Sequence, residues 1–322
     1  MKKCLLIIFL ILGTVIGSGF STGKEIAVFF SRFGYYSFLF IPLVFVMFYF
    51  TFYFLMRKGS KKTYKKSRTI DIIMIFCATI FSSAMFAGIE NCGLKGGYVF
   101  YFLLLLAVLL LCLIACFKKL LFLSKVNLLI VPLLLCIFVI FFFQALPKSS
   151  LGKIDGNGVL IDFFGGGFYS ILYVVLNISL SSVVIASSGD GLTKKQIKWV
   201  SLFASLILSV FIFVINYLLL CNYDFINVAM PLLSLSSGIV NIAIKIAIIF
   251  GCLTTLLSMI YISANCCKRQ SMSHFMTFAV CVALPFLMSV IGFSSIISWL
   301  YPIASFLGVF LLFLLFFKKE KS

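Results

Sequence analysis

The residues of this chain with the most evident chemistry are glycines clustered in its first apolar segment. Residues 13–23 read GTVIGSGFSTG, and three of the glycines fall where the segment would be near the centre of a bilayer. Glycine weakens a helix at that depth and lets backbone amides and carbonyls face a ligand instead of lipid. The pattern predicts an interrupted helix with substrate-binding groups at Gly13, Ile16, Gly17, Ser18 and Gly19.

A stripe of polar side chains lies in the third apolar segment. Thr79, Ser83, Phe86 and Glu90 are spaced by four, three and four residues, so they share one helical face, with Ser82 at its margin. Such a face points to the protein interior, where Ser82, Ser83 and Phe86 are candidates for substrate binding. Hydroxyl groups that join packed membrane helices give the same pattern, and the spacing does not separate the two interpretations.

Three hydroxyl side chains converge in the eighth apolar segment. Thr254 and Thr255 lie four and three residues before Ser258, which places all three on one side of a helix. Hard cations such as Na⁺ prefer oxygen ligands. These hydroxyls, together with a carbonyl freed at Gly13, therefore form a candidate Na⁺ site.

The sixth apolar segment has a polar centre. Asn177, Ser179 and Ser181 belong to a run of weak helix formers, residues 177–182, where a simple membrane anchor would have leucine or valine. One interpretation is a second interrupted helix whose polar groups face the glycine stretch and bind the substrate. The other is that these side chains bond back to their own helix.

Two charged residues are candidates for coupling transport to a cation. Glu25 lies two turns beyond Gly17 and next to Lys24, where it would serve as an outer gate or proton site, or else form an interfacial ion pair. Lys125 lies near the cytoplasmic end of the fifth segment. Its amine either extends to the membrane surface or replaces a coupling cation and carries a proton. Trp299 and Tyr301 are interpreted as anchors at the outer interface.

The composition requires lipid as the solvent that surrounds these residues. The chain has 322 residues, 63% of them hydrophobic, and a mean hydropathy of +1.25, which is more apolar surface than one soluble core can bury. A span length of ~20 residues predicts an all-α polytopic membrane protein with ten transmembrane helices, at 4–32, 35–56, 70–91, 97–117, 120–144, 166–188, 197–221, 236–265, 273–292 and 294–317.

The distribution of charge predicts the orientation of these helices. The net charge is +18, but the cations are concentrated in alternate gaps between apolar segments, which is a topology signal and not a nucleic-acid surface. Both termini are therefore expected in the cytoplasm. The longest outer gap, residues 145–165, is the expected extracellular linker. It separates five helices in residues 1–144 from five in 166–322, which is the condition for a 5+5 inverted repeat.

Enzymatic functions have little support in the sequence. The 11 cysteines form no CxxC pair, and the chain has a single histidine, His274, so the common zinc sites are excluded. Cys92 and Cys221 are both expected near the outer face, and they are the one pair considered for a disulfide. We expect no cofactor apart from Na⁺ or H⁺ as a coupling ion.

The glycine stretch resembles a known family. Residues 13–26, GTVIGSGFSTGKEI, followed by Phe29 and Phe30, look like the first helix of the YkvI-like amino acid permeases of the amino acid–polyamine–organocation superfamily. The resemblance implies a LeuT-type fold in the bacterial cytoplasmic membrane, with helices 1 and 6 interrupted. It also implies that amides of residues 13–19 receive a substrate carboxylate. Thr254 and Thr255 are similar to a hydroxyl pair that completes a sodium site, and Lys125 resembles the amine of proton-coupled members.

Two functions remain open on this sequence. The first is a secondary active transporter that carries a small solute, such as an amino acid, by cation-coupled symport and alternating access. The second is a non-transporting sensor or receptor subunit on the same fold, similar to the permease-like subunits of germinant receptors. Transport of a solute would favour the first function, and binding of a solute without transport would favour the second.

Overall fold

The computed structural model describes residues 2–63, 68–93, 97–117, 120–146 and 158–317. All regular structure in these ranges is helical, with no strand among the described residues. Eight of the described helices are long and apolar enough to cross a membrane. The protein is therefore an all-α polytopic membrane protein, as its composition predicts.

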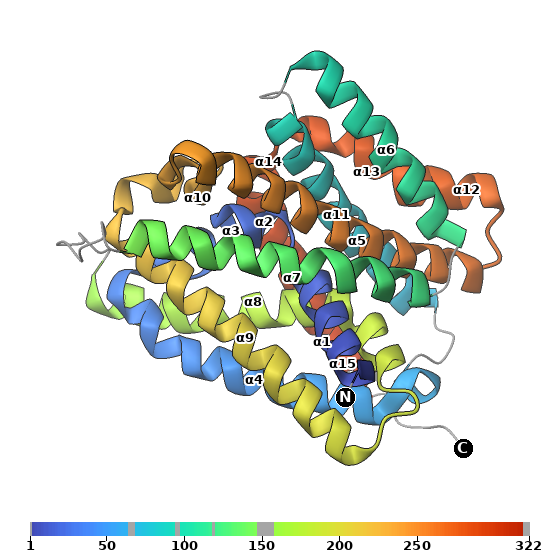
Figure 1. Ribbon diagram of the computed structural model, residues 1–322. Helices are drawn as coiled ribbons and strands as arrows, with labels where there is room; N and C mark the ends of the chain where they lie inside the picture. Colours follow the sequence, from blue (N-terminus) through green and yellow to red (C-terminus); the bar gives the residue numbers. More distant parts are fainter. Residues whose placement is uncertain (1, 64–67, 94–96, 118–119, 147–157, 318–322) are drawn as a thin grey trace.

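The continuous α-helices of 17 residues or more, which are a different set from these eight spans, form a bundle whose members cross at varied angles (Figure 1). They are α4 (Ser37–Thr63), α5 (Arg68–Gly93), α6 (Tyr98–Phe117), α7 (Leu120–Ala145), α8 (Val159–Ser188), α9 (Lys194–Cys221), α11 (Gly238–Arg269) and α15 (Tyr301–Phe317).

Short helices make up the remaining segments. The first segment is divided into α1 (Lys2–Val15), α2 (Ser18–Thr22) and α3 (Lys24–Phe29), and the 3₁₀ helix η1 (Ser31–Tyr36) follows them. Between α9 and α11 lie η4 (Tyr223–Asn227) and α10 (Pro231–Leu235). The ninth and tenth segments contain α12 (His274–Phe278), η5 (Ala279–Ala283), α13 (Leu284–Met288), η6 (Ser289–Ile291), α14 (Phe293–Ser295) and η7 (Ile296–Leu300) before α15.

Helical structure occupies each of the ten expected ranges, but the sixth segment differs from the prediction. The helix α8 runs without interruption from Val159 to Ser188, so the expected linker 145–165 is too long at its C-terminal end. Residues 147–157 lie outside the described residues. The glycines at 165–167 are part of the helix. Their missing side chains leave room for aromatic rings, since a Cβ on Gly166 would lie 3.2 Å from the ring of Phe40.

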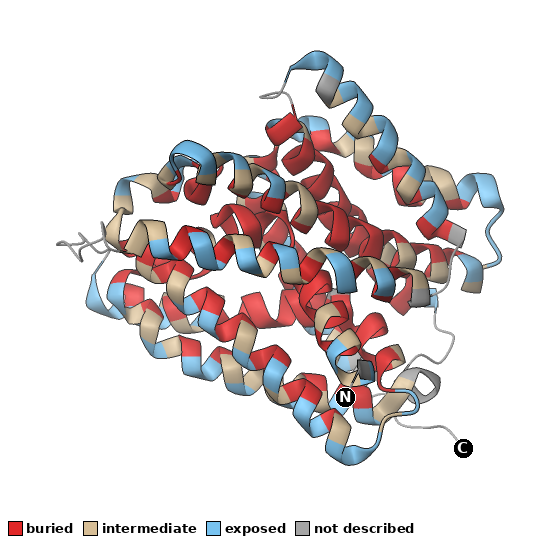
Figure 2. Ribbon diagram, in the orientation of Figure 1, coloured by how far each residue is buried: buried red, intermediate tan, exposed pale blue. Residues whose placement is uncertain are grey.

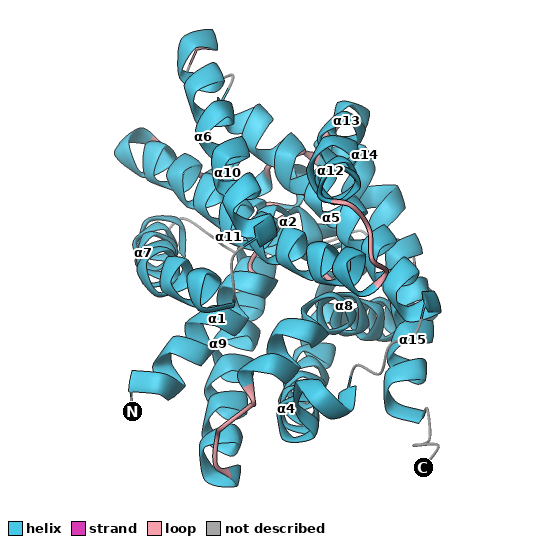
Figure 3. Ribbon diagram, turned by 90° about the vertical axis from the view of Figure 1, so that its right-hand side faces the viewer, coloured by secondary structure: helices cyan, strands magenta, loops and turns pink. Residues whose placement is uncertain are grey.

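The most buried part of the bundle is where α5 and α11 pack along each other with α2 beside them. Figure 2 shows buried residues concentrated on these helices, and Figure 3 places α2 near the middle of the bundle. The outer helices expose apolar side chains, among them Phe102 at 65% on α6 and Trp199 at 49% on α9. Such an apolar exterior is suited to contact with lipid.

Several helix–helix contacts come in pairs whose members are related by a shift of five segments along the chain. The helix α4 packs on α8, and its counterpart five segments later, α9, packs on α1. In the same way α7 packs on α1 and α11, whereas α15 packs on α8 and α5. The helix α6 packs on α11, and α13 packs on α5.

All 11 cysteines lie in the described part of the chain, and none of them forms a disulfide there. The Cys92 thiol lies 3.9 Å from the Met230 sulfur. The considered disulfide between Cys92 and Cys221 is therefore absent.

A buried ion pair joins the start of α5 to the end of α11. The Asp71 side chain is 2% exposed and forms a salt bridge with Arg269. Its carboxylate accepts hydrogen bonds from Arg269 Nε at 2.9 Å and from Gln270 Nε2 at 2.6 Å. Charge-assisted bonds of this kind are about twice as strong as neutral ones, so the pair fixes the register of the two central helices.

We expect Arg269→Gln to lower the free energy of unfolding by about 3 kcal/mol, because the Asp71 carboxylate would stay buried without its cation. Asp71→Asn in the same chain should restore part of that loss. The measurement is the apparent melting temperature by fluorescence-detected size-exclusion chromatography, with Lys194→Gln on the exposed start of α9 as the control. Equal melting temperatures for Arg269→Gln and Lys194→Gln would contradict the assignment.

Candidate functional site

The first helix is interrupted at residues 16–17, which we call the break. The helix α1 ends at Val15 and α2 begins at Ser18, and Gly17 between them is extended, with φ −97° and ψ −163°. The Gly17 N–H bonds only two residues back, to the Val15 carbonyl at 2.9 Å. The interruption that the glycine stretch predicts is therefore present. It frees carbonyls at the end of α1 and N–H groups at the start of α2.

The freed carbonyls face the hydroxyl groups of α11. Thr255 Oγ1 donates to the Gly13 carbonyl at 3.2 Å. Ser258 Oγ lies 3.4 Å from Thr14 Oγ1, and it also bonds to the Thr254 carbonyl. Thr254 Oγ1 donates to the Gly251 carbonyl of its own helix at 3.1 Å. The structure thus brings Gly13, Thr255 and Ser258 of the candidate Na⁺ site together, with Thr254 one residue away on the same buried turn.

Two glycines allow the surrounding helices to approach the break. A Cβ on Gly17 would lie 2.9 Å from Met85 Cε and 3.2 Å from Thr255 Oγ1. On α11, a Cβ on Gly251 would overlap the Ser21 hydroxyl and lie 3.4 Å from the Ile16 carbonyl. Larger residues at these positions would push α5 and α11 away, so the glycines set the width of the site.

The amide side of the break has a weak partner. The Ser18 N–H donates to the Met85 sulfur at 3.2 Å, and Ser18 Oγ lies 3.5 Å from the Ala84 carbonyl. The first bond within α2 is from Ser21 N to Gly17 O, so the Gly19 and Phe20 N–H groups precede it. A thioether is a poor acceptor. A carboxylate would be a stronger partner for these amides.

The predicted stripe on α5 lies inside the protein. Ser82 and Ser83 are 1% and 0% exposed, and they directly precede the Ala84–Met85 pair that contacts Ser18. Thr79 and Ser83 donate to carbonyls of their own helix, at 2.8 and 2.7 Å. Phe86 packs edge-to-face on Phe286 of α13, with ring centroids 5.6 Å apart. These residues form a wall behind the break.

The polar centre of α8 does not interrupt the helix, which corrects the prediction. Asn177 donates to the Tyr173 carbonyl at 3.0 Å, Ser179 to Leu176 at 2.9 Å and Ser181 to Asn177 at 2.5 Å. The hydroxyls bond back to carbonyls three and four residues earlier and so satisfy themselves without unwinding the helix. These hydrogen bonds therefore do not connect Asn177, Ser179 or Ser181 to the break.

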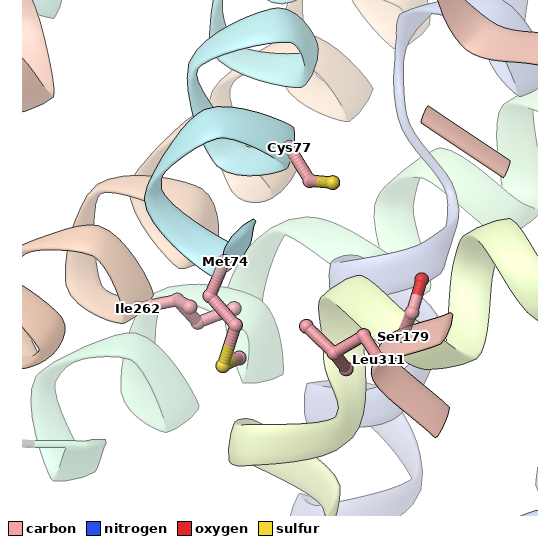
Figure 4. Close-up of a pocket in the computed structure, with 5 residues that line it drawn as sticks. All are labelled: Met74, Cys77, Ser179, Ile262 and Leu311. Carbon is pink, nitrogen blue, oxygen red and sulfur yellow. The ribbon is translucent and has the colours of Figure 1, made fainter. Parts of the chain in front are cut away.

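Ser179 instead lines a narrow void between four helices. Figure 4 shows its hydroxyl with Met74 and Cys77 of α5, Ile262 of α11 and Leu311 of α15. The void leaves no room for a water molecule.

The two charged candidates lie in surroundings that differ from each other. Lys125 is exposed on α7, so its side chain lies outside the buried interior that contains the break, as expected for an amine that extends to the membrane surface. Glu25 is 1% exposed, and its Oε2 has no hydrogen-bond partner. The Lys24 amine is directed to the carbonyls of Ile226 and Asn227, at 3.2 and 3.1 Å. The prediction of an interfacial ion pair for Glu25 is therefore wrong, because this side chain lies in the protein interior.

Sequence reasoning missed Asn127 on α7. Its amide nitrogen is 3.4 Å from the Leu10 carbonyl, its Oδ1 is buried without a partner, and a Cβ on Gly13 would lie 2.8 Å from its Cγ. Asn127 is two residues from Lys125, about 200° around a helix, so an exposed lysine implies an inward asparagine. A lone asparagine in an apolar span was the signal that could have found it.

Comparison with known proteins identifies no relative. No protein-family model matches the chain, and no curated protein matches it. The family resemblance of the glycine stretch therefore stays a prediction, and the argument for function depends on the geometry of the break.

We expect Gly13→Ala to destabilise the protein by about 1–3 kcal/mol, because the added methyl group overpacks against Asn127 and Val131. Asn127→Ala in the same chain should recover more than half of the loss, since the two side chains share one contact. A double-mutant cycle of thermal stability measures this coupling. Strictly additive effects of the two substitutions would contradict the contact.

Proposed function

We propose that the protein is a secondary active transporter that moves a small solute, such as an amino acid, by cation-coupled symport and alternating access. The observation that carries the proposal is the break in the first helix, with carbonyls on one side and amides on the other at the most buried point of the bundle. Helix interruptions at this depth are tolerated where the backbone lines a binding site.

The two sides of the break suit the two ends of an amino acid. The amides of Ser18 and Gly19 are positioned for a carboxylate, which would replace the Met85 sulfur. Ser82, Ser83 and Phe86 would form the wall for the rest of the solute, together with Ile16 and Gly17. We propose that Asn177, Ser179 and Ser181 contribute only when α8 changes its packing.

The packing pattern supports a 5+5 inverted repeat. Residues 1–144 and 166–322 are the proposed repeats, with residues 145–165 connecting them. Contacts between α4 and α8, α1 and α7, and α5 and α15 each have a counterpart five segments away. Rocking of one set of helices against the other would expose the break to each side of the membrane in turn. Positively charged gaps support cytoplasmic termini.

The proposed coupling ion is Na⁺ or H⁺. For Na⁺, the Gly13 carbonyl and the hydroxyls of Thr254, Thr255 and Ser258 offer oxygen ligands close to the break. The Thr255 hydroxyl would turn from donor to ligand when the ion enters. Such an ion would also neutralise the carbonyl end of α1.

Uptake into proteoliposomes tests the proposed function. The protein is reconstituted and given a mixture of ¹⁴C-labelled amino acids with an inward Na⁺ gradient, an inward H⁺ gradient, both or neither. Accumulation that depends on a gradient is the expected result. Binding of a labelled amino acid without any gradient-dependent uptake would contradict transport and favour a sensor or receptor subunit.

We expect Thr255→Ala to raise the Na⁺ concentration needed for half-maximal uptake about tenfold or more, because a ligand to a charged group contributes ~1.5–3 kcal/mol. Thr255→Ser should retain the Na⁺ response. Ser263→Ala is the matched control, since Ser263 is buried on the same helix and bonds to the Met259 carbonyl. An unchanged Na⁺ response in Thr255→Ala would remove this hydroxyl from the coupling site.

A further inference from the structure

Four buried polar atoms without hydrogen-bond partners surround the second half of the first helix. They are Ser21 Oγ, Glu25 Oε2, and the hydroxyls of Tyr173 and Tyr301. The rings of Phe29 and Phe30, at the end of α3, lie 5.6 and 5.2 Å from the Tyr173 ring centroid, and α3 also packs on η7, which directly precedes Tyr301. Buried polar groups are nearly always paired, so the unpaired oxygen of the buried Glu25 carboxyl requires an explanation.

We propose that Glu25 is a proton-binding site, and that its proton is one of the cations that drive the transport cycle. This inference rests on the proposed function for its role in transport, but not for the presence of the bound proton. It adds a second cation position to the Na⁺ site proposed at Thr255.

The Glu25 carboxyl is held beside the break. It folds back along the chain against Gly19, so that a Cβ on Gly19 would lie 2.6 Å from its Cδ. Gly23, which joins α2 to α3, has φ +81°, a conformation that glycine adopts without strain. This turn, and the absence of a side chain on Gly19, together place the Glu25 carboxyl next to the amides that are proposed to bind the carboxylate of the solute.

Cationic side chains near Glu25 are directed elsewhere. The Lys24 amine bonds to the carbonyls of η4, and the Arg32 guanidinium lies 3.9 Å from the ring centroid of Tyr169. The salt bridge found among the described residues, Arg269–Asp71, is a separate pair. Glu25 is thus a fully buried carboxyl with no opposing charge.

The elements packed around this region supply uncharged groups and one exposed carboxylate. Tyr173 comes from α8, Tyr301 from α15 and Cys252 from α11, and all three are buried. From α9, Asn216 donates to Ser37 and accepts from Ser31. In η4, next to the Lys24 contact, Asp224 is exposed.

A proton is the cation that fits these surroundings. An ionised carboxylate without a partner is costly in a membrane interior, and a proton removes the charge without needing any volume. Neither the void lined by Ser179 nor the surface cavity of ≈ 300 Å³ lined by Phe33 and Asp162 borders Glu25. A protonated carboxyl can also donate a hydrogen bond, which an ionised carboxylate cannot.

The position of Glu25 links proton binding to solute binding. A charged Glu25 would repel an anionic group at the Ser18 and Gly19 amides, whereas a neutral one would not. The proton would therefore favour binding of the solute and the closed packing of α3 on α8 and η7. Loss of the proton to the cytoplasm would favour release of both.

Infrared spectroscopy of the purified protein in lipid tests the proton site without any solute. We expect pH-difference spectra to show a C=O stretching band of a buried protonated carboxyl that is lost in Glu25→Gln and kept, at a shifted pH, in Glu25→Asp. Glu90→Gln, at the half-buried end of α5, is the matched control and should retain the band. Tyr301→Phe should move its frequency. A band that persists unchanged in Glu25→Gln would overturn the proposal.

The role in transport is tested by the pH profile of uptake of the ¹⁴C-labelled amino acid mixture. Wild-type uptake should fall as external pH rises, whereas Glu25→Gln should show lower uptake with a flat profile. A wild-type pH profile in Glu25→Gln would overturn the coupling role. Wild-type protein that shows the infrared band but no uptake would overturn the proposed function and leave the proton site standing.

Discussion

The core of a bilayer offers no hydrogen-bond partners, so backbone groups at an interrupted helix must find partners within the protein. The arrangement of the central helices depends on supplying such partners at the break in the first helix. At the break, backbone groups that would bond within a helix instead meet Thr255 on one side and the Met85 sulfur on the other. These partners come from α11 and α5, which pack along each other and are tied at one end by Asp71 and Arg269. The rigid pair of central helices thus supports the irregular backbone.

The two hydrogen-bonding side chains at the break differ in strength, and this difference indicates which side of the break a solute would bind. The Thr255 hydroxyl is a good donor for a carbonyl, whereas a thioether is a poor acceptor for an amide. The carbonyl side is therefore satisfied in the structure and the amide side is only weakly so. A solute with a carboxylate gains most on the amide side, next to the buried carboxyl of Glu25. Proton binding and solute binding would then act on the same short segment of the first helix.

The sequence predicts the interruption of the first helix and the approach of Thr255 and Ser258, because glycine spacing and helical periodicity report those features directly. It does not predict the continuity of α8, since serines that bond back to their helix and serines at an interruption have the same pattern. Tyr301 is fully buried and stacks on Phe81, with ring centroids 4.2 Å apart, although its place beside Trp299 predicted an interfacial anchor. The burial of Glu25 and the contact of Asn127 with Gly13 arise where three or more segments meet. A local pattern can indicate that Asn127 faces inward, but it does not encode which residues of other segments meet it.

The central claim is that the break in the first helix is where a solute binds. Hydrogen–deuterium exchange by mass spectrometry tests it most directly, using protein in lipid nanodiscs and an amino acid selected because it raises the apparent melting temperature. The account predicts slower exchange of the amides in residues 16–23 when that ligand is present. A stabilising ligand that leaves exchange in residues 16–23 unchanged, and slows it elsewhere, would contradict the account.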